Sequence, residues 1–231
     1  MAASHLSRLP HLKAHAMEHS FWKEKWERNE IAFHGSQANR LLVENFDALQ
    51  LPAGSRLFVP LCGKSLDIHW LLAGGYRVAG AELSGIAVEQ LIADLGFSPV
   101  TVQRERLRHH QAEGIDIFEG DVFELSAELL GPVDAIYDRA ALVALPDGLR
   151  QRYVRHLMEI ARRPPQLLIA IEYDASRISG PPFSIPADEV RALYEADYDL
   201  RQLSCEEIAG GLKGNCPAVE RAWLLESRRQ G

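Results

Sequence analysis

The sequence predicts an α/β fold with a doubly wound, mostly parallel sheet of seven strands. Short apolar runs alternate with helical patterns through the middle of the chain, which is typical of parallel strands joined by crossover helices. Glycine and proline stand at the ends of many of these runs and separate one element from the next. The 231 residues are 47% hydrophobic and 25% charged, so the chain can bury a core of ordinary size.

Each expected strand is a short apolar run next to turn residues. In chain order, the candidates for about seven strands are residues 56–60, 77–81, 100–103, 115–118, 133–137, 166–172, 198–203 and 219–225. A charged stretch that ends at Gly114 separates the third candidate from the fourth. The expected helices are residues 65–73, a segment after Ser84, residues 148–161 and residues 186–194. Ser65 and Ser84 precede helical patterns and are expected to be N-caps.

The segment before the first strand differs from the rest of the chain. Residues 17–46 are helical in pattern and are expected to form a helical cover that precedes the sheet. Residues 1–16 lack the apolar centre of a signal peptide and are expected to form a loose extension. We expect one domain over residues 17–231, because no linker rich in glycine or serine interrupts it.

Charge and cysteine content restrict the class of protein. The formal net charge is −7, which gives no support for a nucleic-acid partner, since phosphate contacts need clustered Lys and Arg. No run of about 18 apolar residues occurs, so no membrane partner is expected. The three cysteines show neither a disulfide framework nor metal-ligand spacing, so we expect a reducing, cytoplasmic location and no metal site. We also expect a monomer.

The loop after the first expected strand imitates two nucleotide-binding motifs. Gly63-Lys64-Ser65 matches the end of a P-loop, but that motif needs another glycine five residues earlier, where this chain has Phe58. A dinucleotide fingerprint fails as well, because Gly63 is the one glycine present of the three that it needs. The loop therefore does not predict a phosphate-binding site.

Glu82 is the strongest candidate for a ligand contact. It lies 19 residues after Gly63, at the expected carboxyl end of the second strand. A carboxylate there can accept hydrogen bonds from both ribose hydroxyls of an adenosine ligand. Because pyrophosphate-binding glycines are missing, an adenosine without phosphates, such as S-adenosylmethionine, is the better ligand. The alternative is an ordinary exposed acid at a strand end.

Other polar residues follow later strands of the same sheet. Asp121 follows the strand from residue 115, where it could accept from an adenine amino group, although a loop or helix-cap role stays open. Asp138 and Arg139 end the strand from residue 133. An arginine at such a place favours an anionic partner, and the alternative is a salt bridge with Asp138 or a nearby glutamate.

Four long motifs resemble the thiopurine S-methyltransferase family. They are LFVPLCGKSLDIHWLLAGGYRVAGAELS (57–84), IYDRAALVALP (136–146), GPPF (180–183) and FWKEKWERNEIAFH (21–34). They stand in the family's order, and the resemblance covers almost all of residues 17–225. It implies a class I, Rossmann-like methyltransferase fold that uses S-adenosylmethionine as methyl donor.

The resemblance also implies roles for single residues. Trp22, Trp26 and Phe33 would cover the donor and acceptor from the N-terminal segment. Leu61 and Glu82 would contact the donor, and Asp121 with Val122 would lie near its adenine. Arg139 would lie close to the reacting centre, with Asp138 either orienting it or, as a weaker alternative, taking a proton.

The expected reaction is methyl transfer to the sulfur of a small aromatic or heterocyclic thiol. Two alternatives stay open, namely a methyltransferase for halide, thiocyanate or inorganic selenium and tellurium species, and a non-catalytic module that binds an adenosine ligand. The chain departs from the family at Ala209, where members commonly have a second arginine that faces the substrate.

Overall fold

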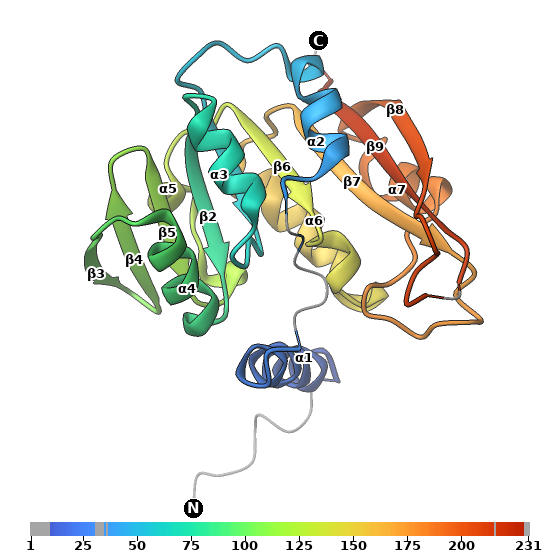
Figure 1. The fold of residues 1–231 in the computed structure, drawn as a ribbon, viewed down its shortest axis with the longest axis horizontal. Helices are drawn as coiled ribbons and strands as arrows, with labels where there is room; N and C mark the ends of the chain where they lie inside the picture. The colour runs from blue at the N-terminus through green and yellow to red at the C-terminus, as the bar shows by residue number, and fades with distance from the viewer. Residues whose placement is uncertain (1–9, 31–34, 36, 215, 229–231) are drawn as a thin grey trace, which may run out of the picture.

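The computed structural model describes residues 10–30, 35, 37–214 and 216–228, and it describes side chains from residue 19 onward. In the described residues, nine strands form one sheet in the order β3-β4-β5-β2-β1-β6-β7-β9-β8 (Figure 1). The strands are β1 (Arg56–Pro60), β2 (Arg77–Glu82), β3 (Val100–Arg104), β4 (Leu107–Ala112), β5 (Ile115–Glu119), β6 (Ala135–Arg139), β7 (Gln166–Tyr173), β8 (Tyr198–Glu207) and β9 (Ala218–Ser227). The helices are α1 (Pro10–Glu27), α2 (Arg40–Asn45), α3 (Leu66–Ala73), α4 (Gly85–Leu95), α5 (Ala127–Leu130), α6 (Asp147–Ala161) and α7 (Ala187–Tyr194).

The five central strands, β5-β2-β1-β6-β7, are all parallel, and antiparallel strands flank them on both edges. This arrangement confirms the doubly wound α/β fold. The sheet has more strands than the seven expected, because all eight candidate runs contain a strand and the charged stretch before Gly114 contains a ninth, β4, which pairs with β3 and β5.

The polar composition of β4 has a physical explanation in its neighbour β5. Arg108 and His110 both contact the carboxylate of Glu119, with the Arg108 Nε at 2.9 Å and the His110 Nε2 at 2.8 Å. His109 Nε2 lies 2.8 Å from Asp116 Oδ1. These cross-strand pairs stabilise a strand whose sequence lacks an apolar run.

Helices cover both faces of the sheet and create two cores. The core on one face contains buried side chains from α2, α3 and α4, and the core on the other contains side chains from α5, α6 and α7. The expected N-caps are confirmed, since Ser65 Oγ accepts from the Asp67 N–H and Ser84 Oγ accepts from the Ala87 N–H. The caps fix where α3 and α4 begin, in the loops that follow the carboxyl ends of β1 and β2.

The N-terminal segment is not the single appendage that was expected. Leu41 and Leu42 of α2 are buried against the sheet, so α2 belongs to the core of the domain. Helix α1 lies apart from the sheet, beneath the end towards which β2 points (Figure 1). Only α1 is therefore placed as a cover. Within the described part of the chain, no helix is both long and apolar enough to cross a bilayer.

Candidate active site

The carboxyl ends of the parallel strands bring together most of the predicted site residues. β1, β2 and β6 end at Pro60, Glu82 and Arg139 and run in the same direction, so these ends share one edge of the sheet. Two non-glycine residues directly after strands at this edge have left-handed backbones, Leu61 with φ 48° and Ala140 with φ 65°. Such strained positions gather at functional sites, which supports this edge as the candidate site.

Glu82 is buried at this edge, with 7% of its surface exposed. Its Oε2 accepts from the Gly63 N–H at 2.8 Å, and its Oε1 accepts from the Ser84 N–H at 2.7 Å. Burial raises the pKa of Glu82, and the N–H groups of Ser84 and Gly63 partly offset this effect. A carboxylate can accept about four hydrogen bonds, which is more than the backbone donors around Glu82 use. The alternative of an ordinary exposed acid is wrong.

Trp26 covers the loop that holds Glu82. Its side chain is 5% exposed, and a Cβ added at Gly63 would lie 3.2 Å from Trp26 Cζ2. Gly63 has a φ of 53°, so both the backbone and the close ring favour glycine there. Trp22, one helical turn earlier, packs edge-to-face on Phe21 at a centroid distance of 5.3 Å. The predicted third aromatic of the cover, Phe33, lies outside the described residues.

Asp121 is the N-cap of the short 3-10 helix Val122–Glu124. Its Oδ1 accepts from the Phe123 N–H at 3.0 Å, so the cap role is present, and its Oδ2 lies 3.5 Å from His19 Nε2 of α1. Val122 is 9% exposed, and its carbonyl oxygen lies 2.7 Å from His156 Nε2. Helix α1 therefore contacts the loop after β5 as well as the loop after β1.

The expected pairing of Asp138 with Arg139 is wrong. Successive side chains of a strand point to opposite faces, and Asp138 points into the core, where it is fully buried. Its carboxylate accepts from the Tyr153 hydroxyl at 2.8 Å and the Leu142 N–H at 3.1 Å. Burial raises the pKa of Asp138 to about 6, against the lowering effect of these donors. Arg139 instead has Asp67 as its carboxylate neighbour, with Nη1 3.9 Å from Oδ2.

Sequence reasoning missed Asp67 and Tyr137. Asp67 is 1% exposed in the first turn of α3, and its Oδ2 accepts from the Tyr137 hydroxyl at 2.9 Å. The sequence signal was weak, since an acid two residues after an N-cap serine is common in helices without any site. Tyr137 looks like one more apolar residue of its strand.

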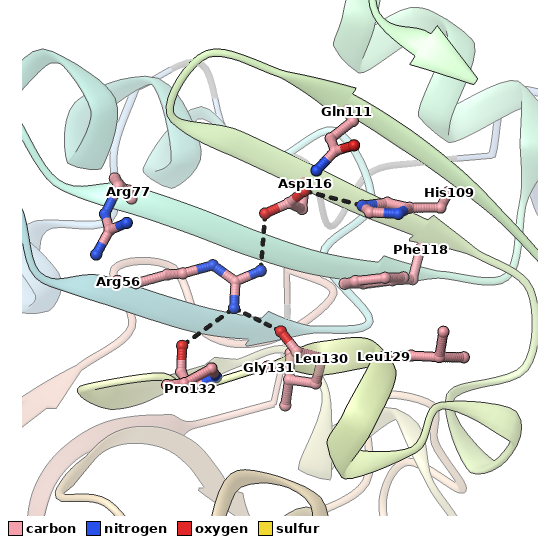
Figure 2. A pocket seen from close by; sticks show the side chains of 10 residues that line it. All are labelled: Arg56, Arg77, His109, Gln111, Asp116, Phe118, Leu129, Leu130, Gly131 and Pro132. Carbon is pink, nitrogen blue, oxygen red and sulfur yellow. Dashed lines mark hydrogen bonds and ion pairs between the residues drawn. The ribbon is translucent and has the colours of Figure 1, made fainter. Parts of the chain in front are cut away.

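A cavity of about 340 Å³ lies at the opposite edge, beside the amino ends of β1 and β2 (Figure 2). Arg56 donates there to Asp116 at 2.8 Å and to the carbonyl oxygen of Pro132 at 3.1 Å, while His109 contacts the same aspartate. These groups satisfy one another and tie β1 to β5. Ligands of open α/β sheets bind at the carboxyl edge, so we assign this network a structural role.

A second cavity, of about 770 Å³, lies at the carboxyl end of β7 beside the loop between β8 and β9. This loop contains Ala209. Among the described residues that line the cavity are three carboxylates, from Glu172, Asp174 and Glu207, and one arginine, Arg221. The Arg221 Nε lies 2.8 Å from Glu172 Oε2, so its charge is compensated.

Comparisons with known proteins address the family. A family model described as thiopurine S-methyltransferase matches residues 17–221. The chain is 53% identical over 212 residues to a thiopurine S-methyltransferase of Xanthobacter autotrophicus, covering 91% of this chain and 99% of the relative. The chain belongs to the thiopurine S-methyltransferase family. Another family member, from Acinetobacter baylyi, is 47% identical over 217 residues and is covered completely.

Solved structures support the same fold for this family member. A SAM-dependent methyltransferase from Anabaena variabilis superposes with a TM-score of 0.62 at 16% identity, covering 91% of this chain and 95% of that one. Magnesium protoporphyrin IX methyltransferase from Synechocystis, with bound SAH, superposes with a TM-score of 0.61 at 13% identity, covering 91% and 100%. These similarities confirm the class I methyltransferase fold.

Proposed function

We propose that this family member transfers the methyl group of S-adenosylmethionine to the sulfur of a small aromatic or heterocyclic thiol. The supporting observation is Glu82, a buried carboxylate at the carboxyl end of β2 that backbone N–H groups hold in place without using all of its lone pairs. When bound, S-adenosylmethionine supplies an electrophilic methyl group on a positively charged sulfonium.

The residues at this edge fit an adenosyl group without phosphates. Glu82 would accept from the two ribose hydroxyls, and the apolar Leu61 and Val122 would contact the adenosine. Asp121 would accept from the adenine amino group in addition to capping the short helix that follows it. Trp26 closes the loop from above and would exclude water from the donor.

Arg139 is the residue we place next to the acceptor. It ends β6 at the same edge, with its side chain 23% exposed, and its guanidinium would favour the thiolate form of the acceptor. A thiolate is already a strong nucleophile, so the protein mainly aligns sulfur, methyl and sulfonium in one line. Good alignment of this kind supplies roughly 7–11 kcal/mol. Asp138 faces the core, which makes it a poor proton acceptor for the reaction. The role proposed for Arg139 therefore does not depend on Asp138.

The cavity beside the loop of Ala209 would hold the body of the acceptor. Its volume of about 770 Å³ suits an aromatic ring system and is far larger than a halide or thiocyanate ion would fill. We therefore favour a thiol acceptor over these alternatives. We place the reaction in the cytoplasm, where the free cysteines Cys62, Cys205 and Cys216 would stay reduced. The monomeric state stays a prediction, which light scattering would test.

The deciding experiment incubates the protein with methyl-labelled S-adenosylmethionine and a panel of heterocyclic thiols, alkyl thiols, selenols, halides and thiocyanate. We expect labelled thioethers from the heterocyclic thiols above all. Turnover of halides or thiocyanate instead would assign the alternative chemistry. Donor binding without turnover of any nucleophile would show a binding module.

Replacing Glu82 by alanine tests the donor site directly. The Glu82→Ala variant should bind S-adenosylmethionine more weakly by about 1.5–3 kcal/mol, the usual contribution of hydrogen bonds to a charged group. Isothermal titration calorimetry measures this difference. The variant Glu113→Ala, at an exposed position in the turn between β4 and β5, is the matched control and should bind as the wild type does. Unchanged affinity in Glu82→Ala would remove Glu82 from the donor site.

A further inference from the structure

The carboxylate of Asp67 is buried beside Arg139 and has no part in the proposed donor site. Its Oδ1 accepts from the Asn39 N–H at 2.7 Å. Its Oδ2 accepts from the Tyr137 hydroxyl at 2.9 Å and faces Arg139 Nη1 at 3.9 Å. Two donors thus hold the two oxygens, so the carboxylate cannot rotate and presents Oδ2 to the guanidinium.

The strand geometry explains why these groups meet. Tyr137 and Arg139 are two residues apart on β6, so their side chains lie on the same face, which is the face that α3 covers. Asp67 stands in the first turn of α3, directly above them. The Tyr137 side chain is 1% exposed, and burial together with the charge of Asp67 raises its pKa well above the ordinary value. Its hydroxyl therefore stays protonated and remains a donor to Asp67.

The contact with Asp67 leaves most of the guanidinium available. At 3.9 Å the ion pair is loose, and among the described residues Asp67 is the one carboxylate within salt-bridge distance of Arg139. An arginine at a strand end that has 23% of its side chain exposed would otherwise sample several rotamers. A fixed negative charge on one side of the guanidinium restricts this choice and directs its other N–H groups away from the carboxylate.

We propose that Asp67 is a positioning residue, which holds the Arg139 guanidinium in the orientation that contacts the thiolate acceptor. This proposal rests on the proposed function. Asp67 touches neither donor nor acceptor and acts through Arg139. Its negative charge opposes a thiolate, but it lies on the far side of the guanidinium, and the Coulomb interaction weakens with distance. The nearer contact between Arg139 and the sulfur therefore dominates.

The variant Asp67→Asn separates positioning from folding. The asparagine Oδ1 can still accept from the Asn39 N–H, and its amide can still bond to the Tyr137 hydroxyl, whereas the attraction for Arg139 is lost. We expect kcat for a heterocyclic thiol such as a 6-thiopurine to fall about tenfold, with the affinity for S-adenosylmethionine unchanged. The matched control is Asp116→Asn, which makes the same change beside Arg56 at the opposite edge of the sheet. It should leave kcat unchanged.

A double-variant cycle tests whether Asp67 acts through Arg139. In an Arg139→Ala background, Asp67→Asn should cause no further loss of kcat, since the group that it positions is absent. Additive losses would overturn the proposal and give Asp67 a structural role. A lower melting temperature caused by Asp67→Asn does not affect this comparison, because the substitution is made in both the wild-type and the Arg139→Ala background.

The ionisation of bound acceptor gives a second readout that does not depend on turnover. Ultraviolet absorbance reports the thiol pKa of a 6-thiopurine bound together with S-adenosylhomocysteine. Asp67→Asn should raise this pKa, because a mobile Arg139 stabilises the thiolate less. An unchanged pKa would leave Asp67 without a role in positioning, and a lowered pKa would show that its own charge dominates. A wild-type protein that methylates no thiol would refute the proposed function instead.

Discussion

At the scale of single residues, Glu82 and Asp138 are both buried carboxylates at strand ends, yet their surroundings give them different uses. Backbone N–H groups hold Glu82 without using all of the lone pairs of its carboxylate. Asp138 lies in the core between the Tyr153 hydroxyl and the Leu142 N–H. Burial raises the pKa of both. The direction of the side chain, and not the pKa, decides which carboxylate can meet a ligand.

The raised pKa of Asp138 predicts a pH-dependent cost to stability. Its ordinary pKa is 3.8 and its pKa in the folded chain is about 6. As the pH rises from 4 to 6, Asp138 therefore loses its proton in the unfolded chain before it does so in the folded chain, which stabilises the unfolded state relative to the folded state. The cost is absent below pH 4 and complete above pH 6. The Asp138→Asn variant lacks this cost. The difference between its free energy of unfolding and that of the wild type should therefore grow by up to about 3 kcal/mol in favour of the variant from pH 4 to pH 7.

Urea unfolding at several pH values measures this difference. The Tyr153→Phe variant removes a hydroxyl that lowers the pKa of Asp138, and it should extend the loss of stability to higher pH. If the difference between Asp138→Asn and the wild type is constant with pH, the folded pKa of Asp138 is not raised.

At the scale of elements, α1 lies over the loops at the carboxyl edge of the sheet. Trp26 lies over Gly63, and His19 lies 3.5 Å from Asp121, so the helix contacts the two loops that are proposed to hold the donor. Most of the other helices lie against a face of the sheet and bury side chains in one of its two cores. A helix attached in this way can open without unfolding the domain. Its closure and the binding of the donor should therefore be coupled.

The Trp26→Ala variant tests this coupling. Loss of the ring should let α1 open, so its amides should exchange with deuterium faster while those of β1 keep their protection. If α1 is then closed for about a tenth of the time, the apparent Kd for S-adenosylmethionine rises about tenfold. Trp70→Ala is the matched control, since Trp70 packs on Phe46 at a centroid distance of 5.2 Å. Equal donor affinity in wild type and Trp26→Ala would show that α1 is not a cover for the donor.

At the scale of the whole molecule, the two edges of the sheet have different roles. The carboxyl edge combines strained turns, a buried carboxylate with free lone pairs and a partly exposed arginine. At the amino edge, Arg56, Asp116 and His109 satisfy one another and hold strands together (Figure 2). A network in which the polar groups are paired contributes to stability and offers little to a ligand.

The Asp116→Asn variant should therefore affect folding alone. Weakening the contacts with Arg56 and His109 should cost about 1–3 kcal/mol of unfolding free energy. Donor affinity and kcat/KM should stay at the wild-type values, since the site lies at the other edge. Thermal unfolding and steady-state kinetics check the two halves of this prediction. A loss of activity without a loss of stability would show that the amino edge takes part in function.

The sequence by itself determined the fold class, the caps at Ser65 and Ser84, and the position of Glu82 at the end of its strand. Each of these depends on a local signal: a periodic apolar pattern, a capping residue or the spacing between neighbouring elements. Because successive side chains of a strand point to opposite faces, the sequence also implied that Asp138 and Arg139 lie on different faces, which is inconsistent with the pairing that was expected. Local patterns do not show which of two such side chains faces the core.

The tertiary structure decided the rest. The strand β4 was hidden because its polar side chains are stabilised by acids of β5, and Asp67 was hidden because its partners Tyr137 and Asn39 lie 70 and 28 residues away in the sequence. A buried polar group is stable only when its partners reach it, and those partners can come from any element of the fold. Such contacts leave no periodic trace in the sequence, so the surroundings of Arg139 could be found only once the chain was folded.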